Sequence, residues 1–165
     1  MKKIDKKKQG KKNKASGAAW ELKVRKDMET CEWFVSKFQN NVEFGKIEDG
    51  NEFIPIKWKD LTLANGEHYP HPNGRMIPAK RKYNQFSRAM TIGTGFPDFI
   101  CWQPITNYDV IGVEAKSNGY LDKEEREKCK WLLENKVFSI ILIAKKKKEG
   151  RKVVVEYVDF KKRYK

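Results

Sequence analysis

Two acidic side chains and one lysine stand at the ends of two short apolar stretches, and their types and spacing could support metal-dependent chemistry. Asp98 follows Pro97 and opens the first stretch, and Glu114 and Lys116 end the second. Side chains along a strand repeat their direction every two residues, so Glu114 and Lys116 should share a face, roughly 6 to 7 Å apart. Two acids and an ammonium group would then meet at one edge of a sheet.

The chemistry that suits this set is hydrolysis of phosphodiester bonds. Two carboxylates can bind Mg²⁺ or Mn²⁺, which are hard cations that prefer oxygen ligands. Such a metal neutralises the scissile phosphate and lowers the pKa of a bound water. The ammonium group orients or activates that water and offsets the charge that develops at the phosphate. We therefore expect a Mg²⁺ or Mn²⁺ site at Asp98, Glu114 and Lys116.

An acid followed two residues later by a lysine is common in this chain, so its context decides its meaning. Only at Glu114 does the pair end an apolar stretch, with a glycine-containing turn ahead and the strand-opening acid Asp98 as a partner. The alternative is a surface salt bridge of Lys116 with Asp98 or Glu114, which would add little stability. The other copies are Asp5 with Lys7, Glu21 with Lys23, Glu134 with Lys136, and Asp159 with Lys161.

The overall charge favours a polyanion as partner. The chain has 165 residues, enough for one hydrophobic core, and its 36 Lys and Arg against 22 Asp and Glu give a net charge of +14. Such a balance attracts nucleic acid through long-range electrostatics and counterion release. An anionic membrane surface is the rival, but no segment combines a long apolar face with a basic one. A third reading is that the lysines serve only solubility or a high working temperature.

Cysteine usage and hydropathy indicate a soluble intracellular protein of the cytoplasm. The three cysteines are odd in number, lie far apart and have no metal-ligand spacing, so we expect them to be reduced. The basic N-terminus has no apolar segment behind it, and the longest apolar run, residues 140–144, is far shorter than a membrane span.

The N-terminal region is expected to be a flexible basic arm followed by a helix. Residues 1–14 contain eight Lys and one Asp, so we assign residues 1–15 to a solvated arm that serves solubility, phosphate binding or both. Ser16 is a candidate N-cap for a helix that ends near residues 29–31. Its apolar stripe contains Val24, Met28 and Cys31, and one turn earlier that stripe passes through Glu21, which is unusual because a buried charge needs a partner. The simpler reading of Glu21 is a boundary residue paired with a nearby basic side chain.

The remaining residues, 16–165, are expected to form a single domain with an insertion at about 40–90. The insertion is irregular, and loops of this length are usually functional or ordered by a partner. His68 and His71 lie in its proline-rich part without a third ligand of matching spacing, which argues against a metal site. Basic side chains alternate there with Tyr83 and Phe86, a pattern that suits unstacked bases and a phosphate backbone, although a solvated surface explains it equally well. The candidate nucleic-acid-binding residues are Arg75, Lys80, Arg81, Lys82 and Arg88.

The elements after Lys116 complete an α/β pattern. Asp122 with Glu125 resembles a capping box, and Cys129, Leu132 and Leu133 follow as one helical apolar face. A β-branched run at 138–144, a charged turn at 145–152 and a last strand at 153–158 come next. With a strand at about 33–39, the order is helix, three strands, helix, two strands. This order predicts an α/β domain in which helices flank a mixed central sheet.

These residues resemble the motifs of the PD-(D/E)XK nuclease superfamily. Pro97 and Asp98, followed by Glu114, Ala115 and Lys116 after an apolar strand, resemble its signature. Gly17 and Glu21 are similar to the Gly-x-x-x-Glu at the first helix of archaeal-type Holliday junction resolvases. The resemblance covers roughly residues 16–39 and 92–145. It implies a restriction-endonuclease-like core, cleavage of branched DNA and a homodimer with two active sites.

The resemblance also implies roles for individual residues. Asp98 and Glu114 would bind the metal together with the backbone carbonyl of Ala115, and Lys116 would serve the attacking water. Glu21 would hold the metal or its water from the helix. Two departures stand out: some fifty residues intervene where these resolvases have a short connection, and Glu124 and Glu125 occupy the region where related nucleases carry a Gln.

Two alternatives to junction cleavage stay open at this point. The first keeps the site and changes the substrate to flaps, nicks or specific duplex sequences, with the insertion as the recognition element. The second is a nucleic-acid-binding protein that does not cleave, for which loss of the Asp98 carboxylate would leave every activity intact.

Overall fold

The computed structural model describes residues 6–44, 46–47, 53–54, 74–79, 82–84, 89–91, 95–103 and 110–165. The chain divides into two compact units. The first comprises Met1–Phe38 and Phe96–Lys165, and the second comprises Gln39–Gly95, which contains the stretch expected to be an insertion. Each unit is described by itself below.

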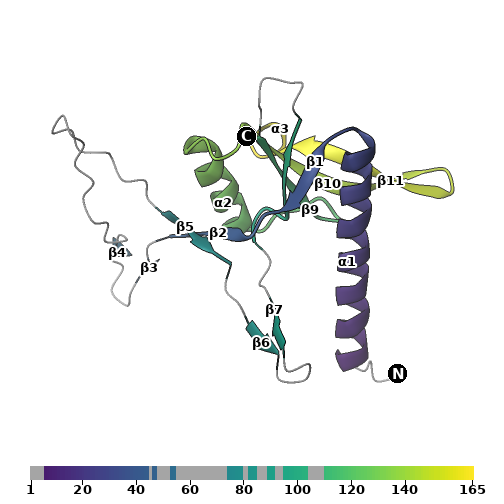
Figure 1. Ribbon diagram of the computed structural model, residues 1–165, viewed down its shortest axis with the longest axis horizontal. Helices are drawn as coiled ribbons and strands as arrows, with labels where there is room; N and C mark the ends of the chain where they lie inside the picture. The colour runs from purple at the N-terminus through teal and green to yellow at the C-terminus, as the bar shows by residue number, and fades with distance from the viewer. Residues whose placement is uncertain are drawn as a thin grey trace. The chain divides into compact units, whose positions relative to one another are not determined.

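The first unit is an α/β structure built on a mixed five-stranded sheet, as predicted (Figure 1). The strand order is β1-β8-β9-β10-β11, in which β9 and β10 are parallel and the other neighbours are antiparallel. Such a sheet flanked by helices is compatible with a restriction-endonuclease-like core. Its elements are α1 (Lys6–Thr30), β1 (Phe34–Lys37), β8 (Phe99–Trp102), β9 (Val110–Ala115), α2 (Lys123–Glu134), β10 (Ile140–Glu149), β11 (Lys152–Asp159) and α3 (Phe160–Arg163).

Helix α1 begins at Lys6, ten residues before the expected N-cap Ser16. The predicted start at Ser16 is wrong, because residues 6–15 of the expected arm continue the helix. Lysine, glutamine and alanine are strong helix formers, and one glycine costs only about 1 kcal/mol, so a capping residue inside the run does not interrupt it. The helix ends at Thr30, as predicted, and Glu32 just beyond has a positive φ of 62°.

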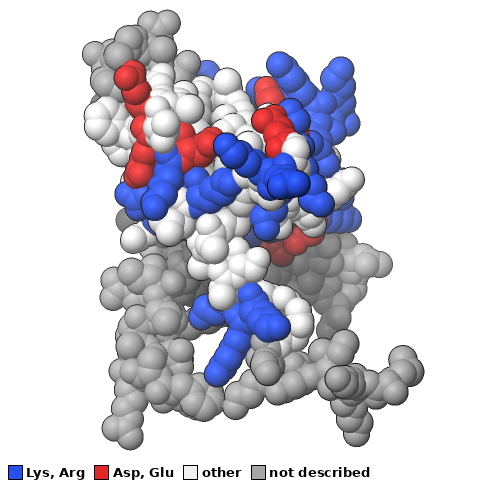
Figure 2. Space-filling model, turned by 90° about the vertical axis from the view of Figure 1, so that its right-hand side faces the viewer, with Lys and Arg blue, Asp and Glu red and all other residues white. Residues whose placement is uncertain are grey.

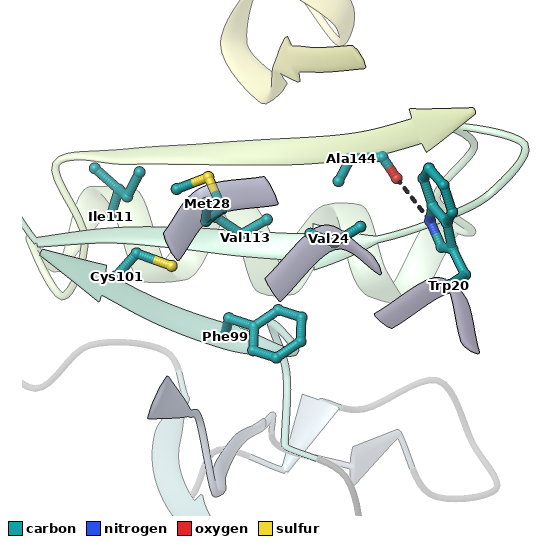
Figure 3. Packing of buried hydrophobic residues seen from close by; sticks show 8 residues of the cluster. All are labelled: Trp20, Val24, Met28, Phe99, Cys101, Ile111, Val113 and Ala144. Carbon is teal, nitrogen blue, oxygen red and sulfur yellow. Dashed lines mark hydrogen bonds between the residues drawn. The ribbon is translucent and has the colours of Figure 1, made fainter. Parts of the chain in front are cut away.

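The core beneath α1 is formed by one stripe of the helix and one face of the sheet (Figure 3). The predicted positions Val24 and Met28 are buried in it, whereas Cys31 is exposed and lies outside it. Trp20 extends the stripe by one turn, and its Nε1 donates a hydrogen bond to the Ala144 carbonyl at 3.3 Å. The sheet contributes Phe99, Cys101, Ile111, Val113 and Ala144. This packing fixes α1 against the strands that carry the predicted acids.

The opposite face of the sheet packs against α2. Asp122 and Glu125 form the predicted capping box at the start of this helix, and Cys129 and Leu132 are fully buried. Gly112 on β9 is required on this face, because an added Cβ would lie 2.8 Å from the Pro97 ring and 3.3 Å from the Ile141 side chain. The absence of a side chain at residue 112 therefore lets the residue before Asp98 pack directly on β9.

The C-terminal hairpin is longer than expected. Strand β10 begins at Ile140 and runs through Glu149, and β11 begins at Lys152, so the charged turn predicted at 145–152 is limited to residues 150 and 151. Antiparallel pairing explains the difference, because every residue of 145–149 faces a partner on β11. One such pair is the ion pair of Lys145 Nζ with Glu156 Oε2 at 2.6 Å.

The second unit contains three separate two-stranded ribbons in its described residues. The ribbons pair β2 (Asn40–Glu43) with β5 (Arg75–Pro78), β3 (Lys46–Ile47) with β4 (Phe53–Ile54), and β6 (Lys82–Asn84) with β7 (Ala89–Thr91).

Within the described residues of the whole chain, no helix is long and apolar enough to span a membrane.

Candidate active site

Asp98 and Glu114 lie side by side at the start of β8 and the end of β9, and the carboxylate of each accepts a hydrogen bond from a backbone N–H of the other strand region. The Asp98 N–H donates to Glu114 Oε2 at 3.0 Å, and the Ala115 N–H donates to Asp98 Oδ2 at 3.0 Å. Both residues are nearly inaccessible to solvent, with exposed fractions of 9% and 6%. The two predicted acids are therefore brought together and fixed by amide groups of adjacent strands.

Lys116 joins this pair from the same face as Glu114. Its Nζ lies 3.5 Å from Glu114 Oε1 and also forms an ion pair with Glu125 Oε1. Glu125 thus has two roles, because its other oxygen accepts the Asp122 N–H in the cap of α2. The sequence indicated Glu125 as a cap and as a residue in the region where related nucleases carry a Gln, but not as a partner of Lys116. Its position in the first turn of the helix after Lys116 was a usable signal.

Glu21 reaches the site through a lysine that sequence reasoning missed. Lys37 Nζ lies 2.5 Å from Glu21 Oε2 and 3.6 Å from Asp98 Oδ1, and it also sits 4.4 Å from the centre of the Phe99 ring. Val35 packs against the α1 core, so strand alternation directs Lys37 toward α1 as well. That alternation was the signal that could have found Lys37.

The site therefore wraps around the ends of two strands. Ile111, Val113 and Ala115 face α1, so alternation puts Glu114 and Lys116 on the α2 face. We call Asp98 and Glu114 the inner carboxylates, and Glu21 and Glu125 the outer carboxylates. Asp98 connects the two faces, because one of its oxygens accepts the Ala115 N–H and the other lies near Lys37.

Burial raises the free energy needed to ionise the two inner carboxylic acids. It raises the pKa of Glu114 to about 8, with the neighbouring Asp98 charge adding to the shift and Lys116 opposing it. Burial also raises the pKa of Asp98, against the hydrogen bond from Ala115 and the charge of Lys37. Two buried acids side by side are stabilised most by a bound cation.

Lys116 keeps its proton in this environment. Burial lowers the pKa of its ammonium group, but the hydrogen bond and charges of Glu125 and Glu114 outweigh that effect and raise it overall. Lys116 is therefore a positively charged hydrogen-bond donor at neutral pH. It can hold an anion or orient a water in this form.

The oxygen donors at the site suit a hard divalent cation. Asp98, Glu114 and the Ala115 carbonyl supply such donors, and Glu21 could add a fourth once its carboxylate leaves Lys37. No group of three acidic, histidine or cysteine side chains in the part of the chain described above is arranged to hold a metal directly. A metal here would thus be bound by the inner pair with backbone and water oxygens, or after Glu21 moves.

The candidate nucleic-acid-binding residues of the second unit are only partly described. Arg75 lies on β5, and its Nη2 forms an ion pair with Glu43 Oε2 at 2.7 Å. Lys82 belongs to β6, where only the backbone is described. Lys80, Arg81 and Arg88 lie outside the described residues, as do His68 and His71.

Comparison of the chain with protein-family models, with curated proteins and with solved structures finds no match. The functional argument therefore depends on the chemistry and geometry of the site.

Proposed function

We propose that this protein is a metal-dependent endonuclease that hydrolyses phosphodiester bonds in DNA. The observation that carries the proposal is the inner pair, in which two buried carboxylates hold each other through backbone amides beside a protonated lysine. A pair of this kind is expensive to maintain as a structural feature, because each buried charge adds a desolvation cost. A cation-binding role explains why the chain keeps it.

Each residue has a role that its contacts support. Asp98 and Glu114 would hold Mg²⁺ or Mn²⁺ with the Ala115 carbonyl, and the metal when bound supplies charge neutralisation at the phosphate and an acidified water. Lys116 donates hydrogen bonds to the attacking water or to a phosphate oxygen, and Glu125 holds it in position. Glu21 is kept near the site by Lys37 and can accept a hydrogen bond from metal-bound water.

DNA is the proposed substrate, and branched DNA is the proposed preference. The net charge of +14 supports a nucleic acid. The preference for four-way junctions is supported only by the resemblance of Gly17 and Glu21 to the resolvase motif. Symmetric cutting of a junction also needs a homodimer, and a protein that sediments only as a monomer with and without DNA would contradict junction resolution.

The test is incubation with labelled four-way junction, flap, nicked duplex, linear duplex and single strand, with Mg²⁺ or with a chelator. We expect Mg²⁺-dependent cleavage, strongest for the junction, and its loss in Asp98→Asn. Preference for a flap, a nick or a duplex sequence would keep the site and change the substrate. No metal-dependent cleavage of any of the five would refute the nuclease proposal and leave a binding protein.

A further inference from the structure

A hollow of about 270 Å³ lies beside the site, between α1 and the end of β9. Its position relative to the acids follows from Ala115, which lines the hollow and donates its N–H to Asp98. The lining residues are Asn13, Ser16, Gly17, Trp20, Ala115 and Ser117. The volume is just below the usual range for small-ligand sites, and it suits one unit of a polymer rather than a whole cofactor.

The α1 side of the hollow continues the buried stripe of the helix. Asn13, Ser16, Gly17 and Trp20 are spaced as neighbours on one helical face, and Trp20 is the last buried member. At residues 13, 16 and 17 that face carries small or uncharged polar side chains, whereas Lys11, Lys12 and Lys14 lie on other sides of the helix and are exposed. The hollow is therefore free of acids, with hydroxyl and amide groups at its wall.

Positive charge borders the hollow. Lys146 Nζ lies 5.3 Å from the centre of the Trp20 ring, and the Lys146 N–H donates to the Ser117 carbonyl at 3.1 Å. Figure 2 looks onto the side of the molecule where α1 lies and shows lysine and arginine side chains gathered there, with acidic ones between them. Uncharged donors flanked by ammonium groups suit a phosphate and a sugar better than a cation.

The hollow does not suit a nucleobase. The Trp20 ring is 4% exposed, its Nε1 is bonded to Ala144, and Lys146 lies over the ring. A buried ring covered in this way offers no free surface for stacking, which is how aromatic residues bind unpaired bases. The hollow is therefore suited to the strand backbone, which has the same chemistry in every sequence.

We propose that this hollow binds the sugar–phosphate unit of the nucleotide next to the cleaved bond. This inference rests on the proposed nuclease function, because the adjacent inner pair would hold the scissile phosphate. The hydroxyls of Ser16 and Ser117 and the Asn13 amide donate to the phosphate oxygens, and Lys146 balances the charge. The contact is independent of sequence and sets which phosphate of a bound strand reaches Asp98.

Two glycines of the same helix allow a matched test. An added Cβ at either Gly10 or Gly17 meets no atom within 4 Å, so a side chain can begin at either position without a clash. Gly17 lines the hollow and Gly10 does not. Gly17→Leu should fill the hollow. Gly10→Leu should raise the helix propensity by the same amount without filling it. Both should keep or raise the melting temperature, because leucine favours a helix more than glycine does.

The measurement is binding of a labelled junction and a labelled duplex in chelator, followed by fluorescence anisotropy at several salt concentrations. We expect Gly17→Leu to weaken binding about tenfold. The slope of log K against log salt should become less steep by about 1, which corresponds to the loss of one phosphate contact. Gly10→Leu should bind like the unchanged protein. Equal behaviour of the two variants, whether both normal or both weak, would overturn the proposal.

A second variant guards against an indirect effect of the leucine. Ser117→Ala removes a donor from the hollow without adding bulk, and it keeps the backbone carbonyl that accepts from Lys146. We expect a loss of about threefold in affinity, and the loss should disappear when the phosphate beside the cleaved bond is replaced by a neutral methylphosphonate. An unchanged affinity, or a loss that persists on the methylphosphonate DNA, would count against the phosphate contact.

The two proposals fail in different ways. If no DNA is cleaved but Gly17→Leu alone weakens binding in chelator, the nuclease function fails and the backbone site stands. If DNA is cleaved and Gly17→Leu binds and cuts normally, the function stands and the hollow is only the space left where α1 runs beyond the sheet.

Discussion

The inner and outer carboxylates of the site are held by different forces. Asp98 and Glu114 are fixed by amide hydrogen bonds between neighbouring strands of the sheet. Glu21 and Glu125 are held by Lys37 and Lys116, whose side chains are 39% and 30% exposed. Ion pairs that are open to solvent even in part contribute less and can rearrange, whereas strand amides are held by the whole sheet. The positions of the inner carboxylates are thus fixed, whereas the outer carboxylates can change partners.

This difference assigns separate functions to the two pairs. In the proposed function the inner carboxylates would define where a cation binds, and that cation would offset the cost of their buried charge. The outer carboxylates and their lysines can exchange partners as a metal or a phosphate enters. Variants of the inner pair should therefore have the larger effects, and variants of the outer pair should change affinity and pH dependence.

The largest effect is expected for Asp98→Asn. The amide oxygen can still accept the Ala115 N–H, but the side chain no longer carries charge for a metal. We expect cleavage to fall on the order of 10³-fold or more, as for loss of a main source of transition-state stabilisation. In chelator the variant should be more stable by about 1 kcal/mol, because a costly buried charge is gone. Cleavage at the original rate with Mg²⁺ would show that the inner pair is not the metal site.

The pH dependence of stability tests the inner pair without any substrate. The pKa of Glu114 is raised from 4.5 to about 8, so the folded protein holds a proton that the unfolded chain loses between these values. The free energy of unfolding in chelator should therefore fall as pH rises from about 4.5 to 8, by up to about 1.4 kcal/mol per pH unit. Denaturant titrations at several pH values measure this slope.

Glu114→Gln should flatten that slope. The matched control is Glu156→Gln, which makes the same substitution at a carboxylate whose pKa is lowered by its hydrogen bond to Lys145. Stability from that group is present above pH 4.5 and is lost as pH falls, so the control should keep the slope between 4.5 and 8. A slope that survives in Glu114→Gln would mean that another group causes it.

Lys37→Met tests whether the outer pair is adjustable. The Lys37 ammonium lies between Glu21 and Asp98, where a cation bound by both would have to lie. Its removal should tighten Mn²⁺ binding about tenfold, because the metal no longer displaces an ion pair or a neighbouring positive charge. Titration followed by electron paramagnetic resonance measures the affinity.

The control for this variant is Lys130→Met on α2, where the lysine is paired with Glu127 at 2.9 Å. It removes one positive charge from an exposed pair away from the inner carboxylates and should leave Mn²⁺ binding unchanged. Unchanged or weaker Mn²⁺ binding in Lys37→Met would mean that the inner pair binds the metal without Glu21.

The same division explains what could be predicted from the sequence. Strand periodicity and local context set these positions, so the proximity of Asp98, Glu114 and Lys116 could be predicted from the sequence. The mixed sheet also followed from the order of elements. Lys37 was missed because its partner Glu21 is sixteen residues away on a different element. Contacts of that kind depend on how a helix packs, and α1 packs through Trp20, Val24 and Met28.

The length of α1 was missed for a different reason. Charge runs are read as solvated segments, but lysine has a high helix propensity, and a helix already fixed by packing extends at little cost. That extension forms one wall of the hollow beside Ala115. An error at one helix boundary thus concealed a candidate binding surface as well as ten residues of structure.

Glu125→Gln is the variant with the smallest expected effect. Glutamine can still cap α2, because a capping box accepts Gln at this position, so the fold should be unchanged. Lys116 would lose a charged partner and keep Glu114 at 3.5 Å, which lowers the pKa of its ammonium group. We expect cleavage at neutral pH to fall only about threefold, and activity to be lost at a lower alkaline pH than in the unchanged protein.

Glu124→Gln, which removes an exposed acid paired with Lys128, is the control and should leave the pH–rate profile unchanged. If Glu125→Gln changed the rate but not the alkaline limb, Glu125 would act through the shape of α2, and Lys116 would not need its charge for the reaction.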